Sequence, residues 1–277
     1  MSAFFPHYEW LVKLMKFTFL GSGSAFTVGA DNFHSNMILT SDRGTKLLID
    51  CGSDIRFSLY LADFTYLDIT DIYISHLHAD HAGGLEFIGL NTMFDPRCDR
   101  PNLYVSSDLA SEIWDRTLSG GMRSVSGAIL ELESFFKVHK IDLHGHFFWE
   151  GIKFSLVKVV HVDNGFFVIP SYGLSFTIDG VNVFLTTDAR ICKGEDCIFY
   201  EQADIIFQDC ETAPFPTNVH AHYTELLELP AAIKRKMWLY HYQPGPLPNA
   251  EKDGFQGFVK RGQVFDFANL GLTSCDP

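Results

Sequence analysis

The feature that most constrains the fold of this chain is a cluster of metal-binding side chains directly after a short apolar segment. The segment is Ile72–Ile74, and the cluster consists of His76, His78, Asp80 and His81. Residues two apart in extended backbone point the same way, so His76 and His78 can bind one ion while Asp80 and His81 bind another. A solvated histidine-rich turn is the alternative, but it needs residue type, spacing and context to coincide. The motif predicts a site for two zinc-like ions at a strand end.

Three later apolar segments also end in residues that can bind metal. Strand ends at one edge of a sheet converge, so residues far apart in the sequence can build one site. Each residue alone would more often be an ordinary core or surface residue, and the recurrence is what favours a shared site. The three are His161 after residues 153–160, Asp188 after residues 181–185, and His241 after residues 238–240.

Segments typical of strands alternate with segments typical of helices, which predicts an α/β fold with mixed sheets. The helices are expected over residues 55–61, 85–92, 108–118 and 223–233. No linker or short-period repeat marks a second domain, so residues 15–277 are expected to form one domain. Residues 1–14 precede the first strand and are expected to be an N-terminal arm.

Residues 92–150 depart most from this alternation and are expected to be an insert or lid region. Within them, residues 119–127 are rich in glycine and serine, which predicts a flexible stretch. Loops of this composition are often lids or binding elements and are often only surface, so both interpretations stay open.

The net charge is −13, from 21 Lys and Arg against 34 Asp and Glu. A strongly acidic chain cannot rely on many phosphate contacts, so nucleic acid is not an expected partner, whereas a small anionic substrate remains possible. The six cysteines form no paired framework, which indicates a reducing compartment. No signal peptide or membrane-length apolar run is present, and a cytoplasmic location in a bacterium or phage-infected cell is expected.

The motif His-x-His-x-Asp-His after a hydrophobic strand resembles that of the metallo-β-lactamase superfamily, and more narrowly that of phosphodiesterases similar to ribonuclease Z. The resemblance extends from about Lys16 to about Phe267. It implies a four-layer αββα sandwich with mixed sheets. It also implies two divalent ions, with zinc expected and manganese as the alternative.

The resemblance assigns each candidate ligand. One ion takes His76, His78 and His161, the other takes Asp80, His81 and His241, and Asp188 bridges the two. Asp50, at another strand end, could orient a ligand histidine or merely cap a turn, and the resemblance favours the first role.

The proton donor is expected in the segment before the last ligand strand. Proteins similar to ribonuclease Z carry a Gly-His-Ser/Thr motif there, whose histidine protonates the leaving oxygen. His220 lies closest to that spacing, although its neighbours are Val219 and Ala221, and His222 is the rival. Asp80 is expected to orient the attacking nucleophile as well as to bind an ion.

The segments His220–Tyr223 and Lys236–Tyr242, in an acidic chain, also resemble those of the anti-Pycsar nucleases, which destroy cyclic nucleotide signals used against phages. That resemblance implies a homodimer that opens 3′,5′-cyclic nucleotides to linear nucleoside monophosphates, with a partner's loop closing over the site. A base could stack on Phe166, Phe167 or Tyr172. The alternatives are a transfer-RNA 3′ endonuclease, a thioesterase or lactonase of the same fold, and a non-catalytic scaffold.

Overall fold

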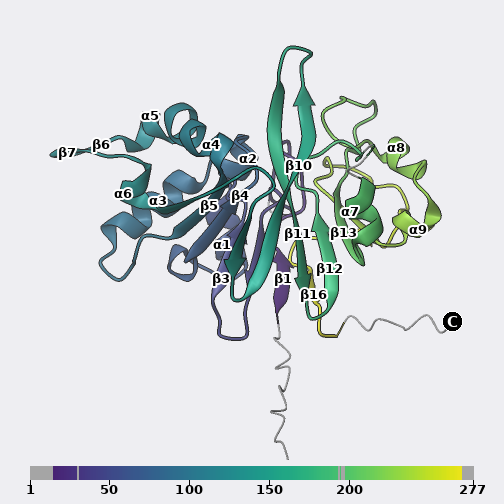
Figure 1. The fold of residues 1–277 in the computed structure, drawn as a ribbon, viewed down its shortest axis with the longest axis horizontal. Coiled ribbons are helices and arrows are strands. Elements are labelled where there is room, and N and C mark those ends of the chain that lie inside the picture. Colours follow the sequence, from purple (N-terminus) through teal and green to yellow (C-terminus); the bar gives the residue numbers. More distant parts are fainter. Residues whose placement is uncertain (1–14, 30, 193, 195–196, 270–277) are drawn as a thin grey trace, which may run out of the picture.

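Two seven-stranded mixed sheets form the centre of the computed structural model, which describes residues 15–29, 31–192, 194 and 197–269 (Figure 1). The expected arm, residues 1–14, lies outside the described residues. In order across the first sheet, the strands are β16 (Val264–Asp266), β1 (Lys16–Phe19), β2 (Met37–Thr40), β3 (Lys46–Ile49), β4 (Asp71–Ile74), β5 (Asn102–Ser106) and β8 (Lys137–Ile141). The pairings from β16 to β3 are antiparallel, and those from β3 to β8 are parallel.

The second sheet repeats this plan. In order, its strands are β15 (Gly257–Phe258), β14 (Met237–Tyr240), β13 (Ile205–Asp209), β12 (Val181–Leu185), β11 (Val168–Ile178), β10 (Ile152–Asp163) and β9 (His146–Trp149). The pairings from β9 to β12 are antiparallel, and those from β12 to β15 are parallel. The carboxyl ends of neighbouring parallel strands therefore meet at one edge of each sheet, where long loops can carry functional residues.

Aromatic side chains fill the space between the two sheets. The ring centroids of Phe17 and Phe19 in β1 each lie 5.2 Å from that of Phe207 in β13. Phe265 of β16 lies 4.8 Å from Phe207 with its ring nearly perpendicular. Such edge-to-face pairs add about 0.5–1.5 kcal/mol each beyond the burial of their area. This aromatic core fixes the two sheets, and hence their carboxyl-end loops, against each other.

Helices cover the outer face of each sheet. On the first sheet, Leu85 and Ile88 of α3 (Leu85–Phe94) share a buried cluster with strand β4 and with α1 (Ile55–Leu61). On the second, Leu226 of α8 (Tyr223–Leu227) packs in a cluster with α7 (Cys197–Gln202) and β14. Figure 1 shows the helices on both sides of the paired sheets. The predicted αββα sandwich is confirmed. Among the described residues, no helix is both long enough and apolar enough to span a membrane.

Two helix predictions need correction. Residues 223–233 form two helices, α8 and α9 (Ala231–Lys234), because Pro230 has no N–H to donate and caps the second one. Helical structure expected to end at residue 118 continues further. It runs through α4 (Ser107–Glu112), the π-helix η2 (Ile113–Leu118) and α5 (Ser119–Met122).

The stretch 119–127, predicted to be flexible, is thus partly regular. Met122 is fully buried and anchors α5 to the core, and a hairpin of β6 (Ser124–Val125) and β7 (Ala128–Ile129) follows. A last short helix, α6 (Leu132–Phe135), leads to β8. Because β5, β8 and β9 belong to the two large sheets, the longest part of the predicted insert outside them is residues 107–136. The role of that segment as a lid stays a prediction.

Candidate metal centre

The predicted ligands all lie where the backbone turns out of a strand or bends within one. His76 follows β4, His78 caps the short helix α2 (Ala79–Ala82), and α2 itself carries Asp80 and His81. Asp188 and His241 follow β12 and β14. The last ligand, His161, lies within β10.

His161 lies within β10 at a break in the β10–β11 register. Val160 pairs with Pro170 and Val162 with Ile169, so His161 is the extra residue of a bulge. A bulge bends the strand and redirects a side chain, and such irregularities are common beside active sites. The sequence suggested that the strand ends here, but it continues to Asp163.

Left-handed backbone occurs at three strand ends around the same place. Asp50 after β3 has a φ of 61°, Thr187 after β12 a φ of 53°, and His241 after β14 a φ of 63°. This conformation is uncommon for residues other than glycine, and it persists where surrounding contacts enforce it. Each of these turns aims a carboxylate or imidazole at the same centre.

The first ligand group brings together His76, His78, His161 and Asp188. Nδ1 of His78 lies 3.1 Å from Nε2 of His76 and 3.1 Å from Nε2 of His161. One oxygen of Asp188 lies 3.7 Å and 3.8 Å from the same two Nε2 atoms. Four potential ligand atoms thus surround one point, and all of these residues except His78 are buried.

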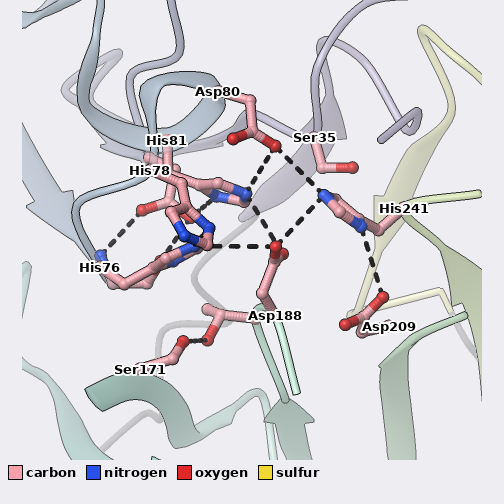
Figure 2. A network of polar contacts seen from close by, with 12 residues as sticks. Ser35, His76, His78, Asp80, His81, Ser171, Asp188, Asp209 and His241 are labelled. Carbon is pink, nitrogen blue, oxygen red and sulfur yellow. Dashed lines mark hydrogen bonds and ion pairs between the residues drawn. The ribbon is translucent and has the colours of Figure 1, made fainter. Parts of the chain in front are cut away.

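The second ligand group consists of Asp80, His81, His241 and the same Asp188 (Figure 2). Nε2 of His81 lies 3.2 Å from Asp80 and 3.2 Å from Oδ1 of Asp188. Nε2 of His241 lies 3.3 Å from Asp80 and 3.3 Å from Oδ2 of Asp188. Asp188 is the one residue that these two groups share. Its role as a bridge between two ions stays a prediction.

These groups fit divalent ions by two independent criteria. Ligand atoms about 2.0–2.2 Å from a tetrahedral zinc ion lie roughly 3.3–3.6 Å from one another. The distances given above are 3.1–3.8 Å in the first group and 3.2–3.3 Å in the second, close to that spacing. In addition, Nε2 of His81 and Oδ1 of Asp188 are buried and, among the described residues, have no hydrogen-bond partner. Buried polar atoms without a partner are costly, and an ion between them would remove that cost.

The protonation of the two groups differs. Burial lowers the pKa of His81 and His241, but the surrounding carboxylates outweigh it. Asp188, Asp80 and Asp50 raise the pKa of His81 well above its usual value, and Asp188 with Asp209 raises that of His241 to about 10. In the first group burial dominates, so the pKa of His161 is lowered to about 4 and that of His76 falls well below its usual value.

The pH dependence of metal binding should therefore differ between the two groups, being weak near neutral pH at the first group and strong at the second. At neutral pH, His76 and His161 are neutral and ready to bind, whereas His81 and His241 hold protons that an ion must displace. Affinity at the second group should rise about tenfold per pH unit for each proton displaced, up to a pH of about 10 for His241. Calorimetric titration in buffers of different ionisation enthalpy counts the protons released, and equal release at both steps would contradict this assignment.

Asp50 is tied to the second group from outside it. One of its oxygens accepts a hydrogen bond from Nδ1 of His81 at 2.8 Å and another from Oγ of Ser75 at 2.8 Å. Its other oxygen accepts the backbone N–H of Ser75 at 2.8 Å. Asp50 thus contacts both the ring of His81 and the start of the motif loop. Its role in orienting a ligand histidine stays a prediction, which these contacts favour over a simple turn cap.

Replacing Asp50 by alanine should lower the affinity of the second group for its ion about 10–100-fold, because the ring of His81 loses its orienting partner. Competition with a coloured chelator measures this affinity. Asp42→Ala, in an exposed turn of the same sheet, is the matched control. Equal affinity in the two variants would contradict the role of Asp50.

The structure also brings in a carboxylate that the sequence did not single out. Asp209, at the end of β13, is fully buried, and its Oδ2 accepts Nδ1 of His220 at 2.7 Å and the backbone N–H of Ala189 at 2.8 Å. Its Oδ1 lies 3.4 Å from Nδ1 of His241. The sequence did contain a signal for Asp209, because this residue comes shortly after a run of apolar residues, as several ligands do. No family motif included it.

The two candidate proton donors lie in different surroundings. The ring of His220 is 4.8 Å from those of His161 and His241, and its side chain is 15 % exposed. Burial lowers the pKa of His220, but the neighbouring Asp209 carboxylate raises it by more, so this pKa lies above its usual value. His222 instead caps α8: Nδ1 contacts Oγ1 of Thr224 at 2.7 Å, and Nε2 donates to the carbonyl of Ala213 at 2.9 Å. Only His220 adjoins both ligand groups.

Of the aromatic residues considered for base stacking, Tyr172 is unsuitable. It is fully buried, and its hydroxyl donates to Asp108 at 2.6 Å. Phe166 and Phe167 lie at the turn between β10 and β11, where their side chains are 95 % and 61 % exposed. These two remain available to a ligand.

Comparison with known proteins agrees with this geometry. The family described as "Anti-Pycsar protein Apyc1" matches residues 15–265. An anti-Pycsar protein Apyc1 of Paenibacillus harenae is 34% identical over 233 residues, covering 82% of this chain and 90% of the relative. One of Bacillus phage vB_BveM-Goe7 is 29% identical over 278 residues, covering 91% and 98%.

Among solved structures, the metallo-β-lactamase fold protein YhfI from Bacillus subtilis has a TM-score of 0.66 with 17% sequence identity. The match covers 92% of this chain and 99% of that protein, which confirms the predicted fold. Together with the family match over residues 15–265, this means that the chain belongs to the anti-Pycsar Apyc1 family of metallo-β-lactamase fold proteins.

Proposed function

We propose that this protein is a di-metal phosphodiesterase that opens 3′,5′-cyclic nucleotides to linear nucleoside monophosphates. The observation that carries the proposal is the position of the His220–Asp209 pair beside two ligand groups that share Asp188. A shared carboxylate suits two neighbouring cations, and an adjacent buried acid pair suits protonation of a leaving oxygen.

Divalent ions held by the two groups would polarise the phosphoryl oxygens and supply hydroxide at neutral pH. The chain itself contributes orientation and a proton. Asp80 and Asp188 keep the ligand imidazoles at 3.2–3.3 Å and so fix the second group. Water that has released a proton to solvent attacks phosphorus as hydroxide while the bond to the ester oxygen breaks, and His220 gives that oxygen its proton.

Asp209 prepares His220 for this step. Nδ1 of His220 donates to Asp209 at 2.7 Å, which leaves Nε2 as the nitrogen free to act on substrate. The same carboxylate favours the protonated imidazole, because its negative charge lies beside the ring. We therefore assign the general acid to His220 and a capping role to His222.

The acidic chain favours a small substrate over transfer RNA. With a net charge of −13, the protein gains little from releasing counterions along a nucleic-acid polymer. A cyclic ester holds both of its ester oxygens in one ring and has little conformational entropy left to lose on binding. Phe166 or Phe167 could stack on a base, a contact worth roughly 1–3 kcal/mol.

We further propose that the protein acts in the cytoplasm of a bacterium or phage-infected cell, as a homodimer, to remove cyclic nucleotide signals. Relatives named anti-Pycsar proteins occur in both bacteria and phages, which supports this context. The segment 107–136, which lies outside the two large sheets, and residues 119–127 within it are the candidates for a loop that closes over a partner's site.

A substrate panel tests the proposal. It comprises cyclic mononucleotides, cyclic dinucleotides, bis-p-nitrophenyl phosphate, precursor transfer RNA and a thioester, assayed with zinc or manganese at equal salt. The highest kcat/KM is expected for a cyclic mononucleotide. Efficient trimming of the transfer-RNA 3′ end without opening of any cyclic mononucleotide would overturn the proposal in favour of the endonuclease, and thioester cleavage alone would favour a thioesterase.

A further inference from the structure

Arg190, a positively charged residue close in sequence to the bridging Asp188, has a buried side-chain nitrogen that lacks a hydrogen-bond partner among the described residues. Arg190 follows the bridging Asp188 by two residues, and its backbone N–H donates to the carbonyl of Val160 at 2.7 Å. Its side-chain Nε is buried, yet within the part of the chain that the structure describes it has no hydrogen-bond partner. No ion pair of Arg190 occurs there either. Burying the Nε–H of a charged guanidinium without a hydrogen-bond acceptor costs free energy. We therefore expect a ligand to supply the acceptor for Arg190.

Arg190 lines a cavity of ≈ 230 Å³ that the proposed general acid also lines. Val160 and Ile191 give this cavity apolar walls, whereas Asn218 and Glu225 add polar groups. The Glu225 carboxylate accepts the backbone N–H of His222 at 3.1 Å, as part of the cap of α8. The cavity therefore combines apolar surface with a guanidinium whose Nε has no hydrogen-bond partner among the described residues, next to His220.

The chemistry of a cyclic nucleotide matches this combination. A single ribose separates the leaving oxygen from the nucleobase, so a nucleotide protonated by His220 must place its base close to that residue. A guanidinium presents donors in a planar fork, and nucleobase edges offer carbonyl oxygens and ring nitrogens that accept them. Val160 and Ile191 can contact the faces of the ring.

We propose that this cavity receives the nucleobase and that Arg190 donates hydrogen bonds to acceptors on its edge. The inference rests on the proposed function and names the residue that binds the nucleoside part of the substrate. Val160 comes from β10, Arg190 from the loop after β12 and Glu225 from α8, so three separate segments of the second half of the chain build the cavity. Figure 1 shows the positions of β10, β12 and α8.

The test compares a substrate that has a base with one that has none. In Arg190→Met, kcat/KM for a cyclic mononucleotide should fall about tenfold to a hundredfold more than kcat/KM for bis-p-nitrophenyl phosphate, because a charge-assisted hydrogen bond to the base is lost. The loss should appear mainly in KM. Arg190→Lys keeps the charge without the fork and should restore only part of the difference.

Arg235→Met is the matched control, since Arg235 is exposed at the start of β14, opposite the end that carries His241. Inhibition of bis-p-nitrophenyl phosphate hydrolysis by a free nucleoside provides a second measurement, and the inhibition constant should rise in Arg190→Met. Equal losses on both substrates, or weaker inhibition by pyrophosphate but not by nucleoside, would overturn the assignment to a base. A wild-type protein that opens no cyclic nucleotide would instead refute the proposed function, while nucleoside inhibition still reports on Arg190.

Discussion

Asp188→Ala is expected to lower kcat/KM for phosphodiester hydrolysis at least about a thousandfold, since several kcal/mol of transition-state stabilisation depend on the ions. Asp188 is the one residue common to both ligand groups, with oxygens 3.2–3.3 Å from His81 and His241 and 3.7–3.8 Å from His76 and His161. Its loss removes a ligand from each group at once.

The variant should also lose at least one of two ions from the purified protein. Removing the carboxylate takes away the main favourable charge that raises the pKa of His81 and His241 against burial. His81 and His241 are then less protonated at neutral pH, which by itself favours metal binding. However, a group with three ligands binds its ion less firmly than one with four. Elemental analysis gives the metal content, and activity against added zinc or manganese shows whether it recovers.

Asp188→Asn and Asp42→Ala complete this experiment. The asparagine keeps the shape of the side chain but has one oxygen and no charge, so it should resemble alanine in metal content. Asp42, exposed in the turn after β2, should change neither metal content nor kcat/KM. Full metal content together with wild-type activity in Asp188→Ala would refute the bridging role.

The ligand set could be predicted from the sequence because its signals are local. His76, His78, Asp80 and His81 lie within one short motif, and each of the remaining ligands comes after an apolar segment of the sequence. Strand ends at the same edge of a sheet meet in space, so their order in the sequence hardly matters. The alternation of strands and helices indicates an α/β fold with mixed sheets, and the four-layer arrangement is what the family resemblance implies.

Other features depend on contacts between distant segments, which the sequence does not display. Asp209 acquires its role only because β13 places it beside His220 and His241. His161 needs a bulge in the β10–β11 pairing, and a bulge leaves no local pattern in composition. Residues 119–127 look flexible by composition, but burial of Met122 holds α5 against the core.

The choice between His220 and His222 shows the same limit of local reasoning. The two histidines are separated only by Ala221, and both precede a helix. Tertiary contacts distinguish them, since His220 faces Asp209 and both ligand groups while both ring nitrogens of His222 contact neighbouring oxygens. Variants of the two histidines should therefore differ in their effect on catalysis.

His220→Ala is expected to slow the opening of a cyclic nucleotide about 10²–10⁴-fold, the usual contribution of general acid catalysis. An alkoxide is a poor leaving group and needs a proton as it departs. Nitrophenolate leaves readily without one, so hydrolysis of bis-p-nitrophenyl phosphate should fall much less. Metal content should stay at the wild-type level, because His220 belongs to neither of the two predicted ligand groups and joins only a third possible grouping, with Asp188, Asp209 and His241.

Two further variants separate a catalytic effect from a structural one. Asp209→Asn should give the leaving-group dependence of His220→Ala in weaker form, because the ring keeps its place but loses the charge that favours its protonated state. His222→Ala removes the cap of α8 and should cost about 1 kcal/mol of stability without any such dependence. Leaving-group dependence in His222→Ala alone would transfer the acid role to His222. Equal losses on both substrates in His220→Ala would mean that this histidine supports the metal centre rather than donating a proton.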